Sequence, residues 1–122
     1  MNMAKTAYAA SQTPIRTPRS IEYEAFARVT HHIKSSAEKG RAGFVQLSRA
    51  VHENRRLWTL LATDVAEQGN TLPPDLRAKI FYLAEFTNLQ SSKVLKDPTE
   101  AKVLVEINTA IMRGLRQKAE VA

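Results

Sequence analysis

The chain has 122 residues, enough for one ordinary domain, and 43% of them are hydrophobic, which allows a compact core. It contains no cysteine, so disulfides, thiolate nucleophiles and cysteine-ligated metal centres are excluded. No apolar run approaches the roughly 18 residues of a membrane span, and the first residues lack the apolar core of a secretory signal. These features predict a small cytoplasmic protein without membrane insertion.

Residues 1–17 show neither a helical nor an alternating hydrophobic pattern, and we expect them to form a flexible N-terminal arm. Thr17 and Pro18 then form the N-cap and first-turn pair that is typical of a helix start. The helix that follows is predicted to end near Gly40. Its apolar stripe consists of Ile21, Ala25, Val29, Ile33 and Ala37, with Phe26 beside them.

A second helix is predicted between Phe44 and Gly69, followed by a rigid connector that ends at Pro74. The pattern fits either one helix of about 25 residues or two shorter helices broken near His52–Arg55. The steps between its inward-facing residues alternate between three and four positions, which is typical of a helix packed against neighbouring helices. These residues are Phe44, Leu47, Val51, Asn54, Trp58, Leu61 and Val65.

Two more helices are predicted in the second half of the chain. One extends from about Asp75 to Leu95, and its main stripe consists of Leu76, Ile80, Leu83, Thr87 and Val94. Asp97, Pro98 and Glu100 then form a capping-box pattern that starts the last helix. The inward face of that helix consists of Val103, Leu104, Ile107, Ile111 and Leu115. The sequence therefore predicts an all-α fold, a small bundle of about four helices over residues 18–118.

The histidines, glycines and carboxylates form no pattern that is typical of an active site. His31 and His32 are adjacent, so on a helix they point in different directions and cannot share a metal ion, and His52 is distant in sequence. The four glycines are scattered, so there is no phosphate-binding loop. We therefore expect a binding module that is not an enzyme and that needs no metal or cofactor.

The net charge is +6, and all of the excess lies before Leu57. A local basic face is therefore possible on the first two helices, but the sequence contains no known RNA-binding signature. The basic residues of these two helices are Arg28, Lys34, Arg49, Arg55 and Arg56. We favour the interpretation that they form a solvent-exposed charged face over the interpretation that they bind RNA.

Three polar or aromatic residues lie among apolar neighbours. For Asn54 and Asn108, a buried hydrogen bond that fixes the helix register is favoured over direct ligand recognition. For Trp58, a core position is favoured over presentation of the indole to a partner.

The third predicted helix carries a second apolar strip, which consists of Tyr82, Phe86 and Leu89. A bundle helix normally needs one apolar arc of a little over 100°. The second strip therefore indicates either a central helix that is covered on two sides, which is favoured, or a helix that lines an exposed groove. An amphipathic helix of another protein would fit such a groove.

Several short motifs follow one another along nearly the whole chain. They are Tyr8-Ala9, Arg19 with Glu22, the run Asn54-Arg55-Arg56-Leu57-Trp58, the run Asn70-Thr71-Leu72-Pro73 with Leu76-Arg77, and Ile107-Asn108 followed by Ile111 and Gly114-Leu115. In this order they resemble the flagellar biosynthesis regulator FlaF family of alphaproteobacteria, over roughly residues 5–116. The sequence departs from the family pattern at Thr109, where a basic residue often follows the Ile-Asn pair.

The resemblance implies a cytoplasmic, non-enzymatic protein that supports the synthesis and export of flagellin. It also implies functional opposition to FlbT, a regulator that restrains translation of flagellin mRNA. The terminal segments of flagellin form amphipathic helices only when they pack in the filament, so a free subunit exposes apolar faces that a helical partner can cover.

We therefore expect an export chaperone whose partner is flagellin, bound through an amphipathic terminal helix, with FlbT as a further candidate partner. The alternative is a post-transcriptional regulator that acts on flagellin mRNA, directly or through FlbT. From helical geometry alone, the predicted contact residues are Trp58, Tyr82, Phe86 and Leu89, with Arg55 and Arg56 as charges at the rim.

Overall fold

The computed structural model describes residues 18–121, with side chains for residues 23–116. Its α-helices are α2 (Pro18–Glu38), α3 (Phe44–Ala66), α4 (Pro74–Lys96) and α5 (Ala101–Val121). The short 3-10 helices η1 (Gly40–Gly43) and η2 (Pro98–Glu100) precede α3 and α5. No strand occurs among the described residues, so the predicted all-α class and helix order are confirmed. The predicted N-terminal arm and the predicted cap at Thr17 lie outside the described residues.

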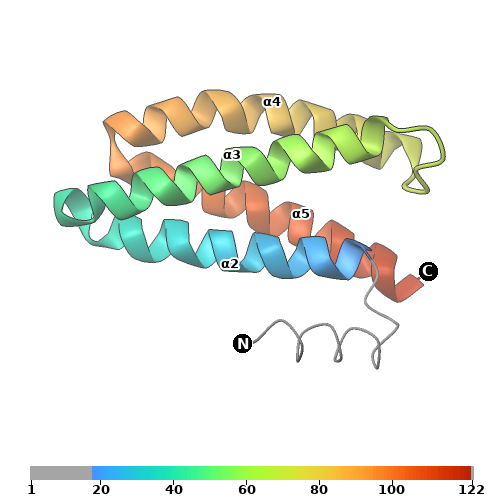
Figure 1. The fold of residues 1–122 in the computed structure, drawn as a ribbon, viewed down its shortest axis with the longest axis horizontal. Coiled ribbons are helices and arrows are strands. Elements are labelled where there is room, and N and C mark those ends of the chain that lie inside the picture. The colour runs from blue at the N-terminus through green and yellow to red at the C-terminus, as the bar shows by residue number, and fades with distance from the viewer. Residues whose placement is uncertain (1–17, 122) are drawn as a thin grey trace, which may run out of the picture.

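Consecutive helices run in opposite directions, so the chain passes along the bundle four times (Figure 1). Each helix packs mainly against two others, in the cyclic order α2, α3, α4, α5. The contact between α2 and α5 is the most extensive of the four, and the contact between α4 and α5 is the sparsest. α4 is therefore held mainly by α3.

The core divides into two apolar clusters along the bundle axis. The first surrounds Trp58 and consists of Phe26, Trp58, Leu61, Val65, Leu72, Ile80, Ile111 and Leu115. In this cluster the rings of Phe26 and Trp58 meet edge to face, with their centroids 5.3 Å apart. The second consists of Val29, Ile33, Leu47, Ala50, Val51, Val94, Ala101 and Leu104.

Most of the predicted inward-facing residues from 23 to 116 are buried or half-buried, and Phe44 is the one that is exposed. The side chain of Ile21 lies outside the described residues. α3 is continuous from Phe44 to Ala66, so the alternative of two shorter helices is wrong. Phe44 was expected inside, but it is 45% exposed. It is the first residue of α3 and lies at the end of the bundle, where fewer neighbours can cover it.

A glycine with a left-handed backbone conformation, that is, a positive φ, follows each of the helices α2 and α3. Gly40 has a φ of 59° and Gly69 a φ of 88°, which other residues adopt at a cost. α3 itself ends at Ala66, before the predicted stop at Gly69. In the connector, the Asn70 side chain accepts a hydrogen bond from the backbone N–H of Leu72 (3.0 Å) and fixes the turn.

Only half of the predicted capping box forms at the start of α5. Asp97 Oδ1 accepts hydrogen bonds from the backbone N–H of Thr99 (3.0 Å) and from its hydroxyl (2.8 Å), so Asp97 caps η2. The Glu100 carboxylate does not close the box, because it accepts a hydrogen bond from Gln90 Nε2 of α4 (2.9 Å). The sequence pattern could not show this competing donor, which lies on the preceding helix.

Candidate functional site

The interior of the bundle also contains a buried polar hub, which consists of Thr30, Asn54, Trp58 and Asn108. The indole Nε1 of Trp58 donates to Asn108 Oδ1 (2.8 Å). Asn108 Nδ2 donates to Asn54 Oδ1 (2.8 Å) and to Thr30 Oγ1 (3.0 Å). The hub therefore ties α2, α3 and α5 together, and the predicted structural role of the two asparagines is confirmed.

The chemistry of the indole orients both amides in the hub. Trp58 can only donate, so Asn108 must turn its oxygen toward the indole and its NH₂ group toward Asn54. Asn54 must then offer its oxygen, which directs its own NH₂ group away from Asn108. That nitrogen, Asn54 Nδ2, is buried without a hydrogen-bond partner.

α4 presents small or polar side chains to the middle of the bundle. Thr87, Gln90 and Ser91 are all buried there, between Ile80 and Val94. The Ser91 hydroxyl donates to the carbonyl oxygen of Thr87, one turn earlier on the same helix (2.7 Å). Gln90 Nε2 donates to the carbonyl oxygen and the carboxylate of Glu100 at the start of α5. The inward side of α4 therefore buries little apolar surface at its centre.

The opposite side of α4 carries large apolar side chains. Tyr82 is 66% exposed, Leu89 is 64% exposed and Phe86 is 37% exposed, and their spacing places them on one face. We call these three residues the α4 outer face. The favoured prediction, a central helix covered on two sides, is therefore wrong, because α4 has other helices on its inward side only. The alternative is a helix that lines an exposed groove, and the structure confirms the exposure of the strip but not a groove along it.

The structure also exposes apolar residues that the sequence patterns did not single out. Val45 and Leu60 project from α3, and each is as exposed as Leu89. Phe81 is 45% exposed on the flank of α4. A helical wheel of α3 and α4 would have separated these positions from the core stripe, but isolated apolar residues are common on protein surfaces. Among the side chains of residues 23–116, only the α4 outer face groups three exposed large apolar residues on one side of a helix.

The other predicted contact residues have different environments. Trp58 is 1% exposed, so its indole belongs to the core and is not available to a partner in this structure. Arg55 is half-buried, and its Nη2 donates to the carbonyl oxygen of Asn88 (3.0 Å) and to Ser92 Oγ (2.9 Å) on α4. Arg56 is exposed, as expected for a charge at a rim.

The predicted basic cluster is dispersed over the bundle. Lys34 lines a cleft between α2 and α5, Arg49 lines one between α2 and α3, and Arg55 lines a cavity between α3 and α4. Because these junctions lie on different sides of the bundle, the three charges do not form one patch that could follow a phosphate backbone.

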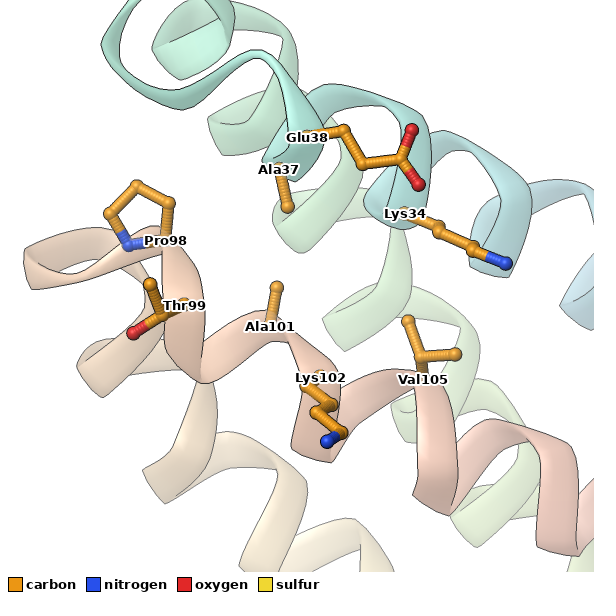
Figure 2. Close-up of a pocket in the computed structure, with 8 residues that line it drawn as sticks. All are labelled: Lys34, Ala37, Glu38, Pro98, Thr99, Ala101, Lys102 and Val105. Carbon is orange, nitrogen blue, oxygen red and sulfur yellow. The ribbon is translucent and has the colours of Figure 1, made fainter.

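The cleft between α2 and α5 lies near the end of the bundle where α2 ends and α5 begins (Figure 2). It has a volume of about 250 Å³, and Ala37 and Ala101 point toward each other across it. Lys34, Glu38 and Lys102 add charges of both signs to its lining. None of the buried polar atoms that lack a partner belongs to this lining. The cleft is therefore a shallow gap between small side chains.

The comparison with known protein families decides the identity of the chain. Residues 4–115 match the family model described as flagellar protein FlaF. The chain belongs to the FlaF family. No curated protein and no solved structure matches it. Family membership makes it a flagellar protein, as the motifs had indicated.

The motifs that resemble the FlaF family mostly build the fold. Asn54, Trp58 and Asn108 form most of the hub, and Asn70 fixes the connector before α4. The α4 outer face contains none of these motif residues.

In residues 18–121 no helix is long and apolar enough to cross a membrane.

Proposed function

We propose that the chain binds flagellin in the cytoplasm as an export chaperone, with the α4 outer face as its docking surface. As a binding protein it performs no catalysis. The proposal is supported by membership of a flagellar family and, above all, by one structural observation. α4 directs Tyr82, Phe86 and Leu89 to solvent while Thr87, Gln90 and Ser91 occupy its buried side.

The physical argument concerns what the exposed strip can bind. Full burial of an exposed apolar side chain contributes about 1.5–3 kcal/mol, and an amphipathic helix along α4 would gain only the part of this that corresponds to the exposed fractions of Tyr82, Phe86 and Leu89. Part of this gain is offset by the loss of translational and rotational freedom on association. Binding through these three side chains alone is therefore expected to be weak and reversible, which allows release of flagellin at the export apparatus.

Calorimetric titration of the purified protein with purified flagellin tests the proposal. The double variant Phe86→Ser and Leu89→Ser should bind about 100-fold more weakly, because two buried apolar contacts are lost. A matched control is the double variant Val45→Ser and Leu60→Ser, which removes two exposed apolar side chains from α3. Unchanged affinity in the first variant, with its helical content retained, would contradict the proposed docking surface.

The salt dependence of binding separates the proposal from the alternative of regulation through flagellin mRNA. Apolar docking should persist or tighten at high salt, whereas phosphate contacts weaken steeply as salt rises. The same titration with FlbT, and with flagellin mRNA, completes the comparison. Binding to RNA or to FlbT without binding to flagellin would favour the regulatory alternative.

A further inference from the structure

The cleft between α2 and α3 is larger than the one between α2 and α5, and its lining contains no residue of α4. Its volume is about 290 Å³, and every lining residue except Ala50 has a polar side chain. A volume of roughly 10–15 Å³ on this measure admits one water molecule, so the cleft has room for a small polar ligand.

The charges in this cleft are separated along its length. Lys39 Nζ donates to Gln46 Oε1 (3.0 Å), which joins α2 to α3 at the end of the cleft next to η1. Because the two helices are antiparallel and side by side (Figure 1), Ser36 and Arg49 lie about one turn from this bond. The acid of the lining, Glu53, lies seven residues beyond Gln46, about 10 Å along α3. The η1 half of the cleft therefore contains two positive charges and no negative one.

The Ser36 side chain supplies an unused hydrogen-bonding group in this half. Ser36 is 6% exposed, and its hydroxyl bonds to no other group in the described part of the chain. The hydroxyl is nevertheless not among the sealed polar atoms, such as Thr87 Oγ1, that have neither a partner nor contact with solvent. Since Ser36 lines the cleft, its hydroxyl can be reached from there. A largely buried hydroxyl without a partner indicates an acceptor that the free chain does not supply.

The two cations also have donors to spare. Arg49 forms no ion pair or hydrogen bond with another described residue, although Glu53 lies four residues further along α3. Lys39 uses one of its three N–H donors for Gln46. A phosphate monoester carries a charge of about −1.5 to −2 at neutral pH and has three strong acceptor oxygens. It can therefore balance both cations and also accept from the serine, whereas a carboxylate brings a single charge.

We propose that the η1 half of this cleft binds a dianionic phosphate group, free or as a monoester. Arg49 and Lys39 neutralise the group, and the Ser36 hydroxyl donates to one of its oxygens. The organic part of a monoester extends toward His32 and Glu53 at the other end of the cleft. One phosphate needs only these two cations, so the site agrees with the dispersal of the other basic residues over the bundle. It does not rest on the proposed function, because flagellin docking involves α4.

The first test titrates inorganic phosphate into the purified protein. Sodium phosphate replaces sodium chloride at constant pH and ionic strength, while the backbone amide signal of Ser36 is followed by NMR. We expect saturable shifts in the wild type and binding about tenfold weaker in Arg49→Gln, the loss expected for one hydrogen bond between charged groups. Arg56→Gln removes an exposed arginine of α3 that lies outside the lining and should bind like the wild type. Shifts that do not saturate, or equal weakening in both variants, would overturn the proposal.

The role of the hydroxyl is tested by a pair of serine variants. Ser36→Ala should weaken phosphate binding about fivefold, because one donor to the charged oxygens is lost. Ser35→Ala is the matched control, since the Ser35 hydroxyl already donates to the carbonyl oxygen of His32 (3.4 Å). Equal affinities of the two variants would overturn the assignment of Ser36 to the site.

The last test identifies the source of the phosphate group and checks its charge. O-phosphoserine and adenosine monophosphate are titrated beside inorganic phosphate, and the probe that binds most tightly identifies a phosphorylated side chain, a nucleotide or free phosphate as the ligand. Acetate and an RNA oligonucleotide offer one negative charge per group, and we expect both to bind at least about tenfold more weakly. Affinity for either of these equal to that for inorganic phosphate would contradict a site built for a dianion.

Discussion

The helices α4 and α5 lie side by side but distribute their side chains in opposite ways. α5 buries Leu104, Ile111 and Leu115, and its exposed positions are mostly charged. α4 buries Thr87, Gln90 and Ser91 at its centre and exposes the α4 outer face. The fold buries or half-buries the apolar face of α5 over the described side chains, whereas it leaves Tyr82 and Leu89 of α4 mostly exposed. Apolar surface that does not stabilise the fold is best explained by a partner.

The two helices also differ in what attaches them to the rest of the bundle. α5 is joined to α2 and α3 through the polar hub and through both apolar clusters. α4 contributes one fully buried residue to each apolar cluster, Ile80 and Val94, and it takes no part in the hub. Its polar contacts come from Arg55 of α3 and reach Glu100 of η2. Mutations on the two helices should therefore have very different effects on stability.

The largest effect is expected from Asn108→Ala, which removes the centre of the hub. The indole N–H of Trp58 would lose its acceptor, Thr30 and Asn54 would lose a donor, and a cavity would form. We expect a loss of about 4 kcal/mol in the free energy of unfolding, measured by urea denaturation. The exposed Asn88→Ala serves as the control, and equal effects of the two changes would contradict the structural role of the hub.

The next largest effect is expected from a pair of substitutions that compares α5 with α4 directly. Leu104→Ala on α5 should lower the free energy of unfolding by about 3 kcal/mol, because a fully buried side chain is removed. Leu89→Ala makes the same chemical change on α4 and should cost less than about 0.5 kcal/mol. If the Leu89 variant lost as much stability as the Leu104 variant, the outer face would have to be part of the core.

A smaller effect is expected from Arg55→Met, which keeps most of the aliphatic stem and removes the bonds to Asn88 and Ser92. We expect the free energy of unfolding to fall by only about 1 kcal/mol, because the side chain is partly exposed. Native-state hydrogen exchange should become faster at the backbone amides of α4 and stay the same at those of α5. Uniform acceleration of exchange over both helices would indicate that Arg55 supports the whole bundle.

A small effect of the opposite sign is expected from Thr87→Val. The hydroxyl is buried without a partner, and a methyl group of the same shape needs none. The variant should gain about 0.5 kcal/mol in the free energy of unfolding. A loss of more than about 1 kcal/mol would show that the hydroxyl is bound in the free protein.

The sequence predicted the stripes of the core well, because a helix with one buried face must repeat its apolar residues every three or four positions. It also predicted that Asn54 and Asn108 bond inside the bundle. It did not show which helices are neighbours, and this determines whether the strip of Tyr82, Phe86 and Leu89 is covered. The bonds of Arg55 to α4 and of Gln90 to Glu100 depend on tertiary contacts that a sequence pattern does not show. For this reason the predicted cap from Glu100 does not form, whereas the rim role of Arg55 stays a prediction.

The central claim is that flagellin covers the α4 outer face, and hydroxyl-radical footprinting of the complex tests it most directly. Tyr82, Phe86 and Leu89 are exposed in the free protein and should be oxidised readily there. We predict that flagellin protects these three side chains from oxidation, while Val45 and Leu60 on α3 keep the reactivity of the free protein. Protection of the α3 residues with an unchanged α4 outer face would contradict the account.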